Sequence, residues 1–152
     1  ADLPGLLFID CNFENCNLSL AKLGNTGFQD AKFKDCKLAG VNFCACRDFS
    51  LSFHFDHCTL DYAIFHTKKL KGIRFIDCTL IEVDFSEADL TSAVFKQCDL
   101  DRAVFSRTLL KGTDFTTARN FTIDPENNAL SRAKFSADTL AGLLTKYNLI
   151  IQ

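Results

Sequence analysis

Phenylalanine or leucine stands at every fifth position along most of this 152-residue chain. The spacing is unbroken from Leu3 to Phe43 and again from Phe55 to Phe115. Five is neither the 3.6-residue period of an amphipathic helix nor the two-residue period of an ordinary strand. The pattern predicts a repeat architecture in which each five-residue unit directs one large apolar side chain into a shared core.

A second column of small or slim side chains lies two residues before each large residue and is also expected to point inward. Its members include Cys16, Ala21, Ala31, Cys36, Val41, Cys58, Ala63, Cys78, Val83, Ala88, Cys98 and Thr113. Asp or Asn often stands between the two columns, and the positions that follow are mostly polar or charged. These remaining positions are expected to face solvent.

Tandem units of this form resemble the pentapeptide-repeat proteins, and Ala88-Asp89-Leu90 and Ala1-Asp2-Leu3 match the repeat outright. The resemblance covers roughly residues 1–118. It implies an all-β fold, a right-handed quadrilateral β-helix in which each pentapeptide forms one side. Four pentapeptides, or 20 residues, would then complete one coil.

The chain also shows a 20-residue period directly. Identical residues stand 20 apart at Leu60, Leu80 and Leu100, at Phe65, Phe85 and Phe105, and at Cys58, Cys78 and Cys98. Such residues would stack as ladders, with coils spaced like strands in a sheet, about 4.8 Å apart. Each coil would bury its apolar row only against its neighbours.

The chain divides into three segments according to how well it follows the five-residue repeat. Residues 1–118 are expected to form the β-helix, with a register break near residues 47–55, where the large positions shift by two. Residues 119–135 are interpreted as a turn segment and one last repeat, and residues 136–152 as a C-terminal capping helix with an apolar tail. The chain begins in mid-repeat without Met, which favours a fragment or a processed form.

The register break is a candidate site for a partner. It begins at Arg47, Asp48 and Phe49, and either Phe49 or Phe53 is the displaced core residue. One interpretation is a plain bulge at a corner of the coil. The other is a projecting feature that binds a partner, because binding residues are often carried by loops on rigid scaffolds.

The C-terminal segment is expected to cover the end of the column. Ser136 is a suitable helix N-cap, and an open β-helix end would otherwise expose unpaired backbone and apolar rows. Resistance-type members of the family dimerise through their C-terminal end, so the resemblance implies a homodimer. The candidate cap and dimer residues are Leu140, Leu143, Leu144, Tyr147, Leu149, Ile150 and Ile151.

Lys68 stands where the repeat expects a small inward residue. Because a buried lysine is rare, either the coil is distorted locally or the side chain extends outward. In the second case it joins Lys69, Lys71 and Arg74 in a basic spot, which is either a solvated charge run or a site for an anion or a partner.

Composition narrows the function classes. A net charge of -2 argues against general nucleic-acid binding, which needs a basic surface. The sequence has neither a run of 18 apolar residues nor a signal-like start, so no membrane contact and a cytoplasmic location are expected. Seven of the eight cysteines fit the inward column and are interpreted as free, packed thiols, which suits a reducing compartment.

Catalysis finds no support in the sequence. The pair His54 and His57 is the nearest approach to a metal site, but no third ligand stands at a fixed spacing. A redox role for Cys44 and Cys46 is the other remote alternative. We therefore expect no enzyme activity, no cofactor and no metal.

Acidic residues gather between positions 82 and 114. The candidate partner-binding face consists of Glu82, Asp84, Glu87, Asp89, Asp99, Asp101 and Asp114. The family includes members that resemble DNA in shape and charge and bind DNA gyrase or topoisomerase IV, which confers resistance to quinolones or gyrase toxins. The resemblance implies a DNA-mimicking binder of this kind. The alternative, favoured by the interleaved Lys96 and Arg102, is a structural or scaffolding module with an unknown protein partner.

Overall fold

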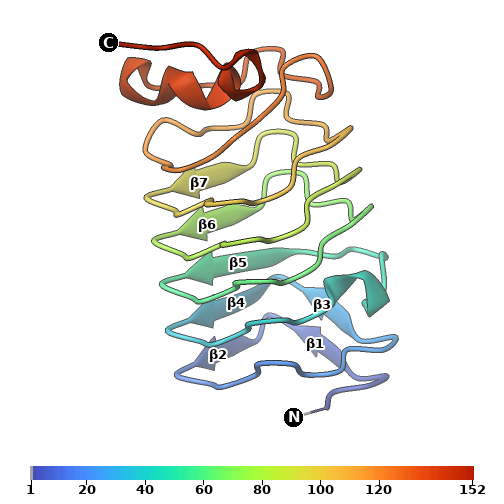
Figure 1. The fold of residues 1–152 in the computed structure, drawn as a ribbon. Coiled ribbons are helices and arrows are strands. Elements are labelled where there is room, and N and C mark those ends of the chain that lie inside the picture. The colour runs from blue at the N-terminus through green and yellow to red at the C-terminus, as the bar shows by residue number, and fades with distance from the viewer. Residues whose placement is uncertain (1) are drawn as a thin grey trace.

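The structure is a computed structural model that describes residues 2–152, and its chain winds into a β-helix with coils stacked along one axis (Figure 1). All strand pairs are parallel, in a two-stranded sheet of order β1-β3 and a five-stranded sheet of order β2-β4-β5-β6-β7. The strands are β1 (Leu7–Ile9), β2 (Asn12–Glu14), β3 (Gly27–Gln29), β4 (Ala31–Lys34), β5 (Phe53–Asp56), β6 (Arg74–Ile76) and β7 (Val94–Lys96). The predicted all-β fold class is confirmed.

The coils repeat every 20 residues, as the sequence predicts. Phe55 pairs with Phe75 and Phe75 with Phe95, and single bridges such as Thr79 to Asp99 continue the pairing on the other sides. Most corners carry one residue in the left-handed region, for example Glu82 at φ 55°. This conformation is unfavourable for residues other than glycine. It is held here because a side of five residues must turn sharply to reach the next one.

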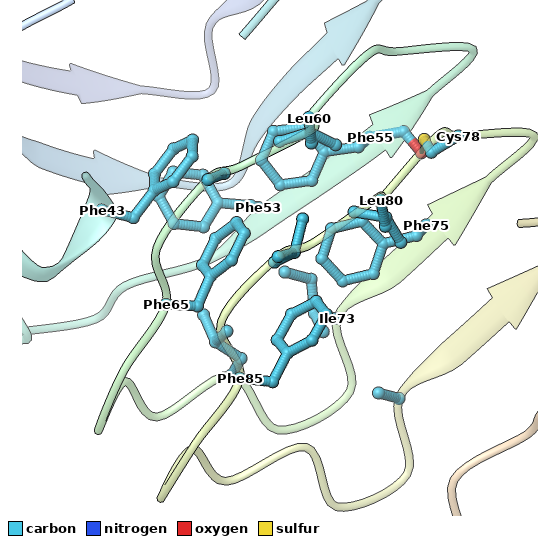
Figure 2. Close-up of a cluster of buried hydrophobic side chains, with 14 of the residues drawn as sticks. Phe43, Phe53, Phe55, Leu60, Phe65, Ile73, Phe75, Cys78, Leu80 and Phe85 are labelled. Carbon is cyan, nitrogen blue, oxygen red and sulfur yellow. Dashed lines mark hydrogen bonds between the residues drawn. The ribbon is translucent and has the colours of Figure 1, made fainter. Parts of the chain in front are cut away.

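Stacked phenylalanine rings fill the interior (Figure 2). Phe75 lies between Phe55 and Phe95 with ring centroids 5.3 Å and 5.2 Å apart and nearly parallel planes. A second ladder, which contains Phe65 and Phe85, meets the first edge to face, and Phe75 and Phe85 are inclined by 73°. Both geometries are favourable for aromatic pairs, so the ladder gains more than buried area alone.

The small inward column contains polar groups that the core satisfies. Thr113 Oγ1 donates to Leu90 O at 2.7 Å, and Cys98 Sγ donates to Phe75 O at 3.2 Å. All eight cysteines are free. Burial raises the pKa of Cys36 to about 11, so this thiol stays neutral at physiological pH. Cysteine and threonine thus serve as slim residues that also donate to carbonyl groups of the neighbouring coil.

The register break is an insertion of two residues ahead of β5. Ala31 pairs with Phe53, 22 residues further on, whereas later coils pair at 20. Phe53 is buried at 1% exposure, and Phe49 is 80% exposed. The alternative left open by the sequence is therefore resolved: Phe49 is the residue displaced from the core. A short 3₁₀ helix, η1 (Phe43–Ala45), precedes the break.

The C-terminal segment covers the last coil, at the red end of the chain in Figure 1. It consists of two 3₁₀ helices, η2 (Ala137–Leu143) and η3 (Thr145–Tyr147), and Ser136 caps η2 by accepting from Asp138 N at 3.2 Å. The candidate cap residues contribute unequally to this cover. Leu143 packs against the core, whereas Leu140 and Tyr147 remain 44% and 49% exposed.

Candidate interaction surfaces

The seven acidic residues between Glu82 and Asp114 do not form one face. Asp84 bridges to Val104, Asp89 to Leu109, and Asp114 to Lys134, which places them in three separate ladders. Asp99 lies in a fourth ladder, paired with Arg119. Because each side spans five residues, aspartates five positions apart lie on successive sides of the column. The expectation of a continuous acidic face is therefore wrong.

Four of these acids cap local turns. Asp84 Oδ1 accepts from Ser86 N at 2.8 Å, and Asp89 and Asp99 accept in the same way from the residue two positions on. Asp114 accepts from both the amide and the hydroxyl of Thr116. Partial burial acts to raise the pKa of Asp114, but the Thr116 hydroxyl and amide hold it below its usual value. These carboxylates satisfy the turn backbone, as Asp commonly does.

The other three acids are paired with arginines. Glu82 lies 3.2 Å from Arg102, and Glu87 lies 3.0 Å from Arg107, in each case one coil away. Asp101 also contacts Arg102, at 3.3 Å. The surface in this region is therefore mixed in sign.

Lys68 is buried, with 3% of its surface exposed, so it does not contribute to a basic spot. Its ammonium Nζ donates to Cys46 O at 2.7 Å and to Asp48 Oδ1 at 2.8 Å. Lys69 and Lys71 are exposed on the same side of the column as Lys68, and Arg74 is exposed on the next side, in β6. Of the two alternatives for Lys68, the outward side chain is wrong, because Cys46 O and Asp48 Oδ1 satisfy its charge where it is buried.

The remote metal and redox alternatives gain no support from the geometry. His54 lies 3.7 Å from Asp30 and His57 lies 3.0 Å from Asp35, so each histidine has a separate carboxylate on the preceding coil. Within residues 2–152, no three His, Cys, Asp or Glu side chains are arranged to hold a metal ion. Burial raises the pKa of Cys46 to about 12, which makes its thiolate inaccessible at neutral pH.

The register break forms a projecting turn. Leu51 N donates to Asp48 O at 3.3 Å, and Ser50 adopts a left-handed φ of 53°, so residues 48–51 close on themselves. Phe49 lies in this turn and is 80% exposed. Arg47 fixes the start of the turn by donating to Gly5 O at 3.1 Å. We call residues 47–52 the insertion loop.

The C-terminal end presents a second apolar surface. Its large exposed residues are Leu140, Leu144, Tyr147, Leu149, Ile150 and Ile151. Ile150 is 88% exposed. A soluble monomer rarely leaves so many large apolar side chains together in water, and such surfaces often mark interfaces.

Comparison with known proteins agrees with this architecture. Residues 69–107 match the family model for pentapeptide repeats, with eight copies. This match identifies residues 69–107 as pentapeptide repeats, and the β-helix extends the same architecture over the coils on either side. No curated protein matches the chain.

Several solved structures share the fold. Full-length QnrB1, a plasmid-mediated fluoroquinolone resistance protein, is 20% identical with a TM-score of 0.62, and the match covers 97% of this chain and 73% of QnrB1. A trypsin-treated variant of QnrB1 is also 20% identical, with a TM-score of 0.60 and coverage of 99% and 72%. At this level of identity the likeness shows the fold alone.

No helix in the described part of the chain, residues 2–152, is long and apolar enough to cross a membrane.

Proposed function

We propose that this chain is a non-catalytic protein-binding module that contacts its partner through the insertion loop. The observation that carries the proposal is Phe49, an aromatic side chain 80% exposed on a turn that projects from a tightly packed column. An aromatic residue of this kind can bury a large area in a partner pocket at little entropic cost. The rigid scaffold supports the proposal, because ordering of the loop costs little on binding.

DNA gyrase or topoisomerase IV is the partner that we propose. Support comes from the likeness of the fold to QnrB1, a fluoroquinolone resistance protein, and from what the family resemblance implies. DNA mimicry through the acidic residues from Glu82 to Asp114 is not part of the proposal, since arginines neutralise several of them and the rest cap turns on different sides. A cytoplasmic location follows from this partner and agrees with eight free cysteines.

A homodimer through the C-terminal end is the second part of the proposal. The exposed residues Leu144, Tyr147 and Ile150 lie in the segment that covers the column end. A second copy could cover these side chains symmetrically, because a two-fold interface uses the same patch on both subunits. Two loops, one from each chain, would then be available to a symmetric partner.

The test is a gyrase supercoiling assay in the presence of a fluoroquinolone, with purified protein titrated in. Wild-type protein is expected to restore supercoiling, and Phe49→Ala to lose this effect. Tyr62→Ala is the matched control, because Tyr62 is also an exposed aromatic, at 58%, but lies at a corner outside the insertion loop. Equal rescue by Phe49→Ala would rule out the loop as the contact surface.

A scaffolding role with a different protein partner is the alternative. It is favoured by the paired charges of the surface, for example Glu87 with Arg107. If the wild-type protein neither rescues nor inhibits gyrase and topoisomerase IV, and binds neither in a direct binding measurement, the topoisomerase proposal fails and the scaffolding role stands.

A further inference from the structure

The insertion loop and the buried lysine are parts of one feature. Lys68 occupies the small inward column between Cys46 on one neighbouring coil and Ala88 on the other. Cys46 is 22 residues before Lys68 and Ala88 is 20 residues after it, so the extra two residues of the loop fall on one side only. Asp48 stands five residues after Phe43, where the repeat would place a large apolar residue, and its side chain is 73% exposed. The loop therefore leaves the column directly beside Lys68.

The ammonium group of Lys68 is fully satisfied at the base of the loop. Its Nζ donates to Cys46 O at 2.7 Å, to Asp48 Oδ1 at 2.8 Å and to Cys44 O at 3.4 Å. An ammonium has three protons, so the three acceptors match its donor capacity. A buried charge without such partners would be strongly unfavourable. The position of Lys68 thus depends on the carbonyl groups before the loop and on the carboxylate at its start.

We infer that Lys68 is the positioning residue of the insertion loop. It connects Asp48, the first residue of the turn, to the adjacent coil, and Phe49 follows immediately. Arg47 makes the corresponding connection to the other side, where its guanidinium also donates to Asn25 Oδ1 at 3.2 Å. The loop is therefore fixed in both directions along the column, to the earlier coils by its own Arg47 and to the following coil by Lys68, and its exposed phenylalanine is presented in a fixed place.

The solvent exposure of Asp48 determines whether replacing Lys68 would mainly loosen the insertion loop or destabilise the whole column. Because the Asp48 side chain is 73% exposed, its carboxylate can be hydrated once the ammonium is gone. The loop can then detach without carrying a buried, unpaired charge. Loss of Lys68 should consequently loosen the loop more than it destabilises the column. Lys68→Met is the suitable change, because it keeps an unbranched apolar stem and removes only the charged donor.

Limited proteolysis with chymotrypsin tests this inference without any partner. Cleavage after Phe49, identified by mass spectrometry, reports opening of the loop. Lys68→Met is expected to raise the rate of this cleavage about tenfold or more, which corresponds to about 1.4 kcal/mol of lost local stability. Lys69→Met is the matched control and should leave the rate unchanged, since Lys69 is the exposed neighbour. A wild-type rate in a folded Lys68→Met protein would overturn the inference.

Asp48→Asn is the second variant and guards against a Lys68→Met protein that does not fold. It removes the carboxylate charge at an exposed position and keeps an oxygen acceptor, so a smaller increase in cleavage after Phe49 is expected. An unchanged rate in Asp48→Asn would contradict the role assigned to the ion pair. Circular dichroism before proteolysis establishes that each variant is folded.

The binding readout rests on the proposed function. Affinity for gyrase should fall about tenfold in Lys68→Met, and Phe49→Ala should add little in that background, because both changes act through one contact. If the loop loosens but affinity is unchanged, Lys68 still positions the loop and the loop is not the contact surface. If the loop does not loosen, the inference about Lys68 fails regardless of what gyrase binds.

Discussion

Replacement of Gly142 by alanine is the most direct test of how the cap is seated. Gly142 lies in η2 with its backbone against Phe121, a residue that is only 4% exposed. A methyl group added at Gly142 would lie 2.8 Å from two ring carbons of Phe121 and closer still to its carbonyl oxygen. Neither neighbour can move easily, because the oxygen belongs to the backbone and the ring is enclosed in the core. Gly142→Ala should therefore push η2 away from the column.

The expected loss has two parts. Overpacking at a closely fitted contact costs about 1–3 kcal/mol. The hydrogen bond from Ile123 N to Gly142 O, at 2.9 Å, would also lengthen or break, and such a bond contributes about 0.5–1.5 kcal/mol. Together they predict a loss of about 1.5–4.5 kcal/mol, which in a chain of this size lowers Tm by about 3–18 °C. If the cap detaches fully, its own docking energy sets the upper limit.

Thermal unfolding by circular dichroism measures the loss, and hydrogen exchange at the Ile123 amide localises it. Gly24→Ala is the matched control, because a methyl group at Gly24 meets nothing within 4 Å and its φ is not positive. That change should be neutral or stabilise by up to about 1 kcal/mol. A Gly142→Ala protein with the Tm of Gly24→Ala and a fully protected Ile123 amide would refute the close seating of the cap.

Three further predictions concern the core, the cap and the dimer. Phe95→Ala should destabilise by about 3–5 kcal/mol in urea unfolding, because the ring is fully buried in the ladder; a loss below 1 kcal/mol would contradict the packing. Hydrogen bonds from Lys146 lower the pKa values of Asp124 and Glu126, so their stabilisation is complete above about pH 5 and disappears as pH falls through the lowered values. The stability difference between wild type and Lys146→Met should therefore shrink in acid; a constant difference would exclude this linkage. Ile150→Glu should convert a dimer to a monomer in sedimentation velocity, and an unchanged mass would exclude this interface.

The parts of the fold that the sequence predicts are those governed by the core. Large residues at every fifth position identify the inward positions, and the 20-residue ladders follow from identities such as Phe75 with Phe95. The insertion of two residues could be located because the large positions shift between Phe43 and Phe55. The shape of the insertion could not be predicted, because residues 49 and 53 are both phenylalanine and either could fill the core. Only backbone pairing of Phe53 with Ala31 decides between them.

The candidate sites were harder to predict than the core. Which surface side chains meet depends on the side of the column on which each residue lies, and nearness in sequence does not determine this. A cluster of acids in the sequence suggests one face, but five-residue sides distribute Asp84 and Asp89 to different faces. The Lys68 to Asp48 pair did leave a signal. The two residues are 20 positions apart, close to the length of one coil, and each violates the repeat at its own position. Taken separately, the two violations suggested an outward lysine and a bulge; taken together, they predict an ion pair.

Departures from the repeat are therefore the most informative positions for function in this chain. A residue that follows the repeat is explained by packing or by turn capping, as Phe75 and Asp114 are. Neither packing nor turn capping explains Lys68 and Phe49. Lys68 buries a charge in the apolar column, and Phe49 exposes a large ring to water. Each is unfavourable by itself, and the insertion loop accounts for both, because the lysine holds the turn that presents the phenylalanine. Packing of the column alone requires neither a buried lysine nor an exposed phenylalanine, and this is the physical reason for placing the proposed binding function in the insertion loop.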